Sequence, residues 1–142
     1  DDIADHAKFA GHFGCPRVMH HADGAAALGI ERIIEGDATV SLDTDLECIP
    51  TPGHTRGHQV LLYREEALFT GDHLAWSPSR QSLLAFRDAC WYSWPVQIES
   101  MKRLLACRFE WVLPGHGRIH RLPAAEMHEQ LERCVEWMQR RA

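Results

Sequence analysis

Three short stretches constrain the fold of this chain more than any other feature: residues 51–55 (TPGHT), 69–73 (FTGDH) and 113–117 (LPGHG). Each one follows an apolar, strand-like run and places a metal-capable side chain beside a glycine. A strand carries its last side chain to the rim of a sheet, and glycine lets the backbone turn sharply there. If the strands are neighbours, His54, Asp72 and His116 meet at one rim. The pattern therefore predicts a metal site assembled from loops.

The donor types at this rim indicate which ions it would hold. Imidazole together with carboxylate suits Zn²⁺, Fe²⁺ or Mn²⁺. His54 and His58 have the i, i+4 spacing of a helical zinc pair, but Pro52, Gly53 and Gly57 make a helix improbable there. We therefore expect His54 to end one strand and His58 to begin the next. The alternative for the three motif residues is that they are ordinary turn residues at strand ends.

Hydrophobic periodicity and turn residues predict mixed helix and strand structure. Helices are expected over residues 2–13, closed by Gly14, over 96–107 and over 124–140, with a short alanine-rich turn of helix at 23–28. Strands are expected at 16–20, 33–34, 38–42, 46–49, 58–63, 67–70 and 109–113, and residues 74–95 are expected to be irregular. This order indicates α/β or α+β layering in one domain over residues 1–142.

Composition excludes several classes of protein. The net charge is −5 and the basic residues are scattered, so no nucleic-acid footprint is expected. No apolar run approaches the roughly 20 residues of a membrane span. The five cysteines never occur as C-x-x-C and mostly lie in apolar surroundings, which favours core thiols and a cytoplasmic location. The chain opens on Asp1 without an initiator Met, so we expect residues to precede it. No oligomeric state follows from the sequence.

In order and spacing, the three motifs resemble those of the metallo-β-lactamase superfamily, whose hydrolases use a P-G-H-T loop, a strand-terminal G-D and a P-G-H-G loop. The resemblance implies an αββα sandwich, and because the family domain is longer, its N-terminal strands are expected to be absent here. It also implies a dinuclear centre. His54 would bind the first metal and His116 the second, and Asp72 would bridge the two.

The remaining family motif, H-x-H-x-D-H at a helix start, is matched only at its D-H end, by Asp5 and His6. By resemblance both would bind the second metal, and Asp5 would orient the attacking water. Two positions before Asp5 the chain has Ile3 where the family has histidine. Asp1 or Asp2 would substitute for that histidine if the motif carries a short insertion. The alternative is that these acidic residues only begin a helix.

Other side chains near the motifs have roles that the residues leave open. His58 and His73 are expected to hydrogen-bond to the ligands rather than bind metal, or else to be exposed to solvent. The aromatic residues of segment 91–95 would form a substrate wall or a lid, or would only pack on the sheet. Arg80 and Arg87 would contact an anionic substrate, on grounds of position alone.

The implied function is hydrolysis of a small-molecule ester or thioester, of the hydroxyacylglutathione type, by a metal-bound hydroxide. The implied cofactor is one or two Zn²⁺ ions, with Fe or Mn as the other ions that the donors suit. Two alternatives stay open at this stage. One is an iron-dependent oxidoreductase on the same scaffold, and the other is a non-catalytic, degenerate member with one metal or none.

Overall fold

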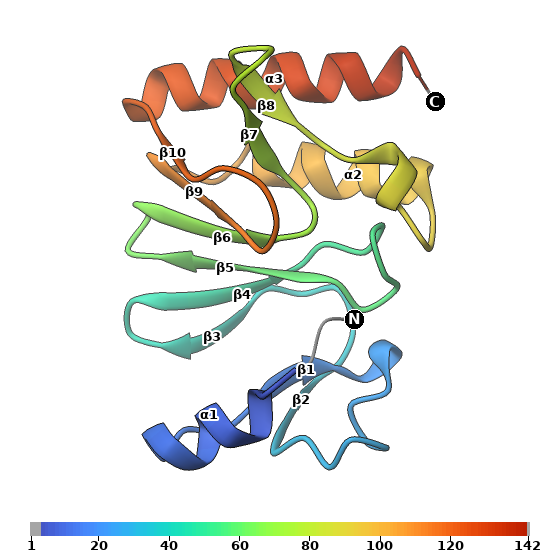
Figure 1. Cartoon of the computed structure of the whole chain (residues 1–142), viewed down its shortest axis with the longest axis vertical. Coiled ribbons are helices and arrows are strands. Elements are labelled where there is room, and N and C mark those ends of the chain that lie inside the picture. Colours follow the sequence, from blue (N-terminus) through green and yellow to red (C-terminus); the bar gives the residue numbers. More distant parts are fainter. Residues whose placement is uncertain (1–3, 142) are drawn as a thin grey trace.

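A six-stranded sheet organises the computed structural model, which describes residues 4–141 (Figure 1). Its strands lie in the order β10-β9-β6-β5-β4-β3, and all neighbours are antiparallel except the parallel pair β6 and β9. The strands are β3 (Val40–Asp43), β4 (Leu46–Pro50), β5 (Gln59–Tyr63), β6 (Ala67–Gly71), β9 (Trp111–Pro114) and β10 (His120–Arg121). The expectation that the motif-bearing strands belong to one sheet is confirmed.

The core lies between one face of this sheet and the helices α2 (Trp94–Leu104) and α3 (Ala124–Gln139). Alternate strand residues such as Val60, Leu68 and Val112 are fully buried against the helices. The inward stripe predicted for α3 is confirmed, since its four members are all buried: Met127, Leu131, Val135 and Met138. Burial of these apolar surfaces is the main force that holds the helices on the sheet.

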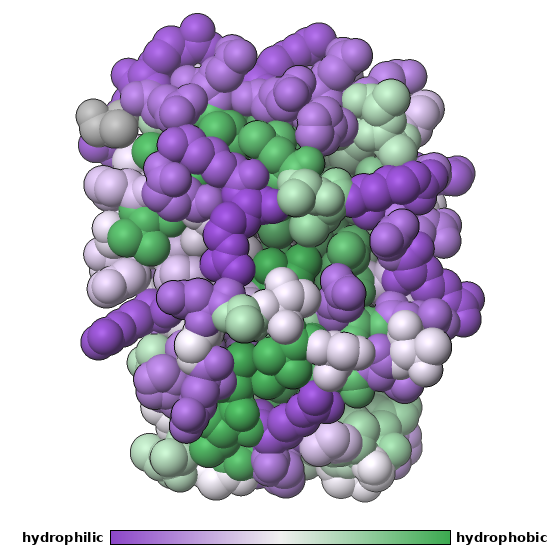
Figure 2. All heavy atoms as spheres, turned by 180° about the vertical axis from the view of Figure 1, so that it is seen from behind, coloured by the Kyte–Doolittle hydropathy of each residue, from purple (hydrophilic) through white to green (hydrophobic). Residues whose placement is uncertain are grey.

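The N-terminal part forms a separate layer along the longest axis of the molecule (Figure 1). It contains α1 (His6–Phe13), the parallel pair β1 (Val18–His20) and β2 (Arg32–Ile34), and the 3₁₀ turn η1 (His21–Asp23). Gly14 closes α1 in the left-handed conformation, with φ 62°, as predicted. The helix buries none of its residues. In the view from behind, hydrophobic residues reach the surface in patches separated by more hydrophilic residues (Figure 2).

For the connecting segments, one expectation is wrong and one is confirmed. Residues 74–95 are not wholly irregular, because they contain the hairpin β7 (Ala75–Ser77) and β8 (Ser82–Leu84), followed by the 3₁₀ turn η2 (Arg87–Ala89). Each hairpin strand has three residues, too few to show a period of two. The helical turn expected at 23–28 is present, since the Leu28 amide donates to the Gly24 carbonyl at 3.3 Å. It follows the 3₁₀ turn η1, which Gly24 ends at φ 84°.

Burial of the cysteines leads to a prediction about their reactivity. All five thiols are free, and burial raises the pKa of Cys48 to about 11 and that of Cys134 to about 12. At pH 8 their thiolate fractions are then roughly 10⁻³ and 10⁻⁴, and only the thiolate reacts. We expect iodoacetamide to label the exposed Cys15 first and to spare Cys48 and Cys134 until the chain is unfolded. Mass spectrometry of peptides after timed labelling measures this. Equal labelling rates for Cys15 and Cys134 would contradict it.

Candidate metal centre

The three motif loops leave the large sheet at one edge because their strands are close neighbours. His54 follows β4, Asp72 follows β6 and His116 follows β9, and β5 lies between the first two strands. The backbone N–H of Gly115 donates to the carbonyl of Gly71 at 2.7 Å, which joins the second loop to the third. The convergence predicted from the glycine turns is confirmed for these three side chains.

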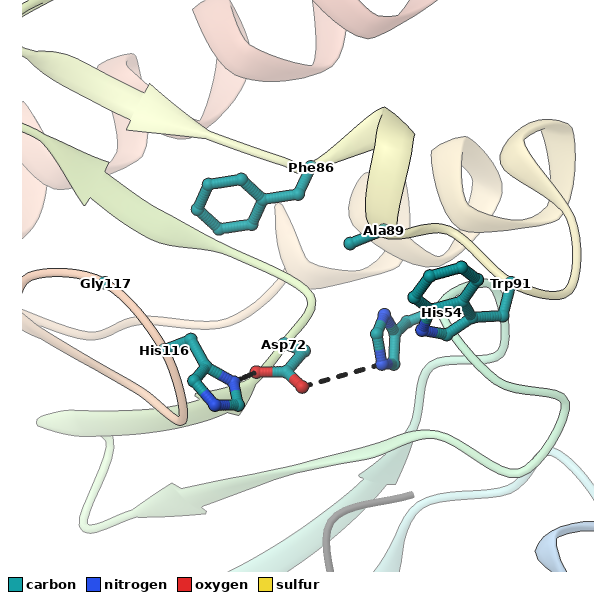
Figure 3. Close-up of a pocket in the computed structure, with 7 residues that line it drawn as sticks. All are labelled: His54, Asp72, Phe86, Ala89, Trp91, His116 and Gly117. Carbon is teal, nitrogen blue, oxygen red and sulfur yellow. Dashed lines mark hydrogen bonds and ion pairs between the residues drawn. The ribbon is translucent and has the colours of Figure 1, made fainter.

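Asp72 lies between the two histidines (Figure 3). His116 Nδ1 donates a hydrogen bond to Asp72 Oδ1 at 2.6 Å, and His54 Nε2 lies 3.6 Å from Asp72 Oδ2. His54 is 3% exposed, whereas the side chain of His116 is 71% exposed. All three line a cavity of about 690 Å³ whose further wall includes Phe86, Ala89 and Trp91. Each carboxylate oxygen is thus directed at a different imidazole, beside an open and largely apolar cavity.

Comparison with known proteins supports the resemblance to the metallo-β-lactamase superfamily. No family model matches the chain. Hydroxyacylglutathione hydrolase of Polaromonas sp. strain JS666 is 36% identical over 78 residues, which are 52% of this chain and 30% of that protein. The structure of the BLEG-1 B3 metallo-β-lactamase matches 97% of this chain and 72% of its own, with a TM-score of 0.65 at 19% identity.

Further solved structures agree. A metallo-β-lactamase from Pontibacter korlensis matches 94% of this chain and 62% of its own, with a TM-score of 0.62 at 18% identity. The di-iron-bound form of TTHA1623 matches 92% and 70%, with a TM-score of 0.57 at 19% identity. The chain has the metallo-β-lactamase fold. The resemblance drawn from the glycine turns, and the αββα fold class expected from it, are confirmed. The chain spans under a third of its curated relative.

Within the metallo-β-lactamase fold, the donor set at this edge fits a metal of the zinc type. Two imidazoles and a carboxylate are the ligands that such ions take, and a catalytic zinc is held by three protein ligands. The side chains form a line, His54–Asp72–His116, and among residues 4–141 no three histidine, cysteine or acidic side chains enclose a common point. Asp72 accepts a hydrogen bond from His116 through an oxygen that would otherwise bind the metal. The donors fit, and rotation of exposed His116 would release Asp72.

The other ligands implied by resemblance lie at the start of α1. Asp5 precedes α1 in the left-handed conformation, with φ 61°, and its side chain forms no helix-capping hydrogen bond. His6 begins α1. In the part of the chain that the structure describes, neither lines the cavity that holds His54, and their metal-binding roles remain predictions. Asp1 and Asp2 lie outside the described residues.

His58 and His73 pack behind the metal centre as neutral rings. Their imidazoles stack at 4.9 Å, and Thr51 Oγ1 is hydrogen-bonded to His58 Nδ1 at 3.0 Å. Desolvation by the surrounding protein, with help from nearby His54, lowers the pKa of His58 to about 4. Burial, with His58 beside it, holds the pKa of His73 well below its usual range. Neither ring carries a positive charge at neutral pH. Among the described residues the ring nitrogens of His73 make no hydrogen bond, so its part is stacking.

The segment before α2 holds the His54 loop from one side, a contact that no sequence pattern predicts. The amides of Trp91 and Tyr92 donate to the His54 carbonyl at 2.9 and 3.1 Å, and that of Ser93 donates to the Gly53 carbonyl at 3.0 Å. From α2, buried Gln97 Nε2 donates to the His73 carbonyl at 3.3 Å. Hydrogen bonds from amides and side chains to distant carbonyls follow no fixed spacing in the sequence. The structure alone shows that this segment and α2 together join the first and second motif loops.

Asp23 of η1 holds the same loop from the other side. Its Oδ2 accepts from Thr55 Oγ1 at 2.6 Å, and its Oδ1 accepts from the Gly57 amide at 2.7 Å. Gly57 has no room for a Cβ, which would lie 2.8 Å from Asp23 Cγ. Since more than 30 residues separate the partners, no local motif indicates the contact. Asp23 thereby links the N-terminal layer to the loop that carries His54.

Asp23→Ala is expected to destabilise the protein and to loosen the His54 loop. The change leaves the Thr55 hydroxyl and the Gly57 amide without their acceptor, which costs about 1–3 kcal/mol. Asp23→Asn retains one amide oxygen and is expected to lose less. Urea denaturation of both variants measures the effect, with the exposed Asp37→Ala as the matched control. A midpoint for Asp23→Ala equal to that of the control would show that the two hydrogen bonds contribute nothing.

Proposed function

We propose that the chain carries the metal centre of a hydrolase that cleaves small esters or thioesters. The observation that carries the proposal is the Asp72 carboxylate between two imidazoles from neighbouring strand ends, beside a cavity of about 690 Å³. That volume suits a small-molecule ligand. Hydroxyacylglutathione-type thioesters are the proposed class, supported by the curated relative of that name. We further propose a cytoplasmic setting, which the free thiols favour; within residues 4–141 no helix has the length and apolar character of a bilayer span.

Each residue of the site has a defined part in this proposal. His54, Asp72 and His116 would hold the metal, joined by Asp5 and His6 if the N-terminal motif completes the centre. Zinc, as one ion or two, is the proposed metal, and iron or manganese suits the same donors. When bound, such a metal supplies a hydroxide nucleophile at neutral pH and polarises the oxygen of the substrate.

The chain's own groups provide orientation and a dry wall. Buried His54 is held by the amides of Trp91 and Tyr92 on its carbonyl, so its ring approaches from a fixed direction. Asp72 fixes the tautomer of His116 by accepting from its Nδ1. Phe86 and Trp91 present apolar surface beside the carboxylate, where an acyl chain would exclude water. Asp5 is proposed to orient the attacking water.

The test is turnover of the purified chain of 142 residues, loaded separately with zinc and with iron. A panel of thioesters, esters and lactams is offered at neutral pH, with release of thiol or acid as the readout. We expect zinc-dependent thioester cleavage that exceeds lactam cleavage. Oxygen consumption by the iron-loaded chain, without any hydrolysis, would overturn the proposal in favour of an oxidoreductase. Metal binding without turnover of any substrate would indicate a non-catalytic member.

A further inference from the structure

A second cavity, of about 430 Å³, adjoins the metal centre and differs from it in charge. It lies between the β7–β8 hairpin, η2 and the end of α3. Three of its lining residues, Phe86, Ala89 and Trp91, also line the first cavity, so the two spaces share one wall. Its remaining lining includes Arg80, Arg87 and Arg141, together with Trp137.

These three arginines are held by aromatic rings rather than by acidic side chains. The guanidinium carbons of Arg80 and Arg141 lie 5.5 and 5.0 Å from the centroid of the Trp137 ring, and that of Arg87 lies 5.9 Å from the Trp94 ring. Trp94 and Trp137 pack edge to face at 6.2 Å. A stacked guanidinium keeps its N–H groups free for hydrogen bonds at its edge.

The charge of the cavity is not neutralised from within. Arg87 Nη1 donates to the backbone carbonyl of Arg141, and in the described ranges no ion pair joins any of the three arginines to a carboxylate. Asp88 is the one acidic residue among those that line the cavity, against three arginines. In a chain with a net charge of −5, this is a local excess of positive charge. Planar guanidinium groups match the geometry of carboxylates and phosphates.

We propose that this cavity is a subsite for an anionic group, a carboxylate or a phosphate, on the part of the substrate remote from the scissile bond. The proposal rests on the proposed hydrolase function, since it places the reacting group at Asp72 and the anionic arm beyond Phe86. Because Phe86, Ala89 and Trp91 line both cavities, a substrate that extends over these side chains would occupy both. Arg80 and Arg87 would donate to the oxyanion, and Arg141 would add charge from the far side.

The test compares thioesters that share one acyl group and differ only in the thiol. The N-acetylcysteamine thioester is neutral, the glutathione thioester bears carboxylates, and the coenzyme A thioester bears phosphates. Hydrogen bonds to charged groups are worth enough that loss of one is expected to raise KM about tenfold. Arg80→Gln and Arg87→Gln should each do so for an anionic thioester and leave kcat/KM for the neutral one unchanged. Loss confined to one anionic thioester would identify its group as the ligand.

Control variants separate charge from structure. Arg80→Lys keeps the charge and should recover part of the KM, whereas a packing role would not be rescued this way. Arg133→Gln removes an exposed arginine of α3 that is paired with Glu129. It should change KM for neither the neutral nor the anionic thioester. Equal losses for the neutral and anionic thioesters in Arg80→Gln and Arg87→Gln would overturn the subsite.

A binding measurement that needs no catalysis keeps this proposal distinct from the hydrolase function. S-methylglutathione and S-methyl coenzyme A have no scissile acyl bond, and calorimetry of the metal-free chain measures their binding directly. We expect at least one to bind, with an affinity that falls about tenfold in Arg87→Gln and weakens with salt. Such binding by a chain without thioesterase activity would support the subsite while the hydrolase proposal fails. Unchanged binding in the arginine variants would overturn the subsite even in an active hydrolase.

Discussion

Asp72→Ala is expected to remove tight zinc binding, since this carboxylate lies between the imidazoles of His54 and His116. Loss of a residue that merely orients a ligand costs about 10–100-fold in metal affinity. Removal of a ligand shared by the whole centre should therefore weaken binding at least about 100-fold. Competition of the variant with a chromophoric zinc chelator measures this constant, and thioester turnover should fall with it.

Asp45→Ala is the matched control for this change. Asp45 is an exposed aspartate whose carboxylate pairs with Arg64 at 3.0 Å, remote from the motif loops in the sheet. It removes the same charge without touching the proposed centre, so zinc affinity should stay at the wild-type value. Zinc affinity of Asp72→Ala within twofold of that control would show that Asp72 is not a ligand.

Gly53→Ala is expected to give the largest loss of stability of any single methyl addition in the motif loops. A Cβ at Gly53 would lie 2.3 Å from Gln97 Cβ and 2.5 Å from Gln97 Cα, and the φ of 153° is rarely adopted by residues with a side chain. Because Gln97 Cα belongs to the backbone of α2, the helix itself must shift. Overpacking and backbone strain together are expected to cost about 3 kcal/mol or more, which lowers Tm by roughly 6–12 °C.

A glycine with open space provides the comparison. Gly11 lies inside α1, and nothing lies within 4 Å of a Cβ built there. Gly11→Ala should therefore stabilise the chain by about 0.5–1 kcal/mol through helix propensity. Calorimetry of both variants gives the two shifts. A Tm for Gly53→Ala at or above that of Gly11→Ala would contradict the packing of α2 on the His54 loop.

The convergence of the candidate metal ligands could be predicted from sequence, because strand and turn chemistry are local. An apolar run followed by Gly53, Gly71 or Gly115 predicts a strand end, and parallel or neighbouring strand ends share an edge. That reasoning predicts that His54, Asp72 and His116 meet, and the structure confirms it. The inward stripe of α3 was predicted for the same reason, since a period of 3.6 persists over 16 residues.

The hydrogen bonds that hold the motif loops in place cannot be predicted from sequence, because they join residues far apart in the chain and follow no period. Asp23 reaches Thr55 across 32 residues, and Gln97 reaches the His73 carbonyl across 24. The sequence indicates a contact with an anionic substrate for Arg80 and Arg87 by their position alone. The cavity that they share depends on Trp137 of α3. The hairpin β7–β8 is not predicted from sequence, because strands of three residues are too short to show a period of two. Local rules thus predict the candidate ligands, and tertiary packing determines how firmly each one is held.

The most direct test of the proposed centre is the position of zinc in crystals of the chain, located by anomalous scattering at the zinc edge. We expect a peak between His54, Asp72 and His116, within about 2.0–2.2 Å of imidazole nitrogen and carboxylate oxygen. A second peak beside Asp5 and His6 would establish the dinuclear form. Zinc bound only elsewhere on the chain, with His116 still donating to Asp72 in zinc-soaked crystals, would contradict the account.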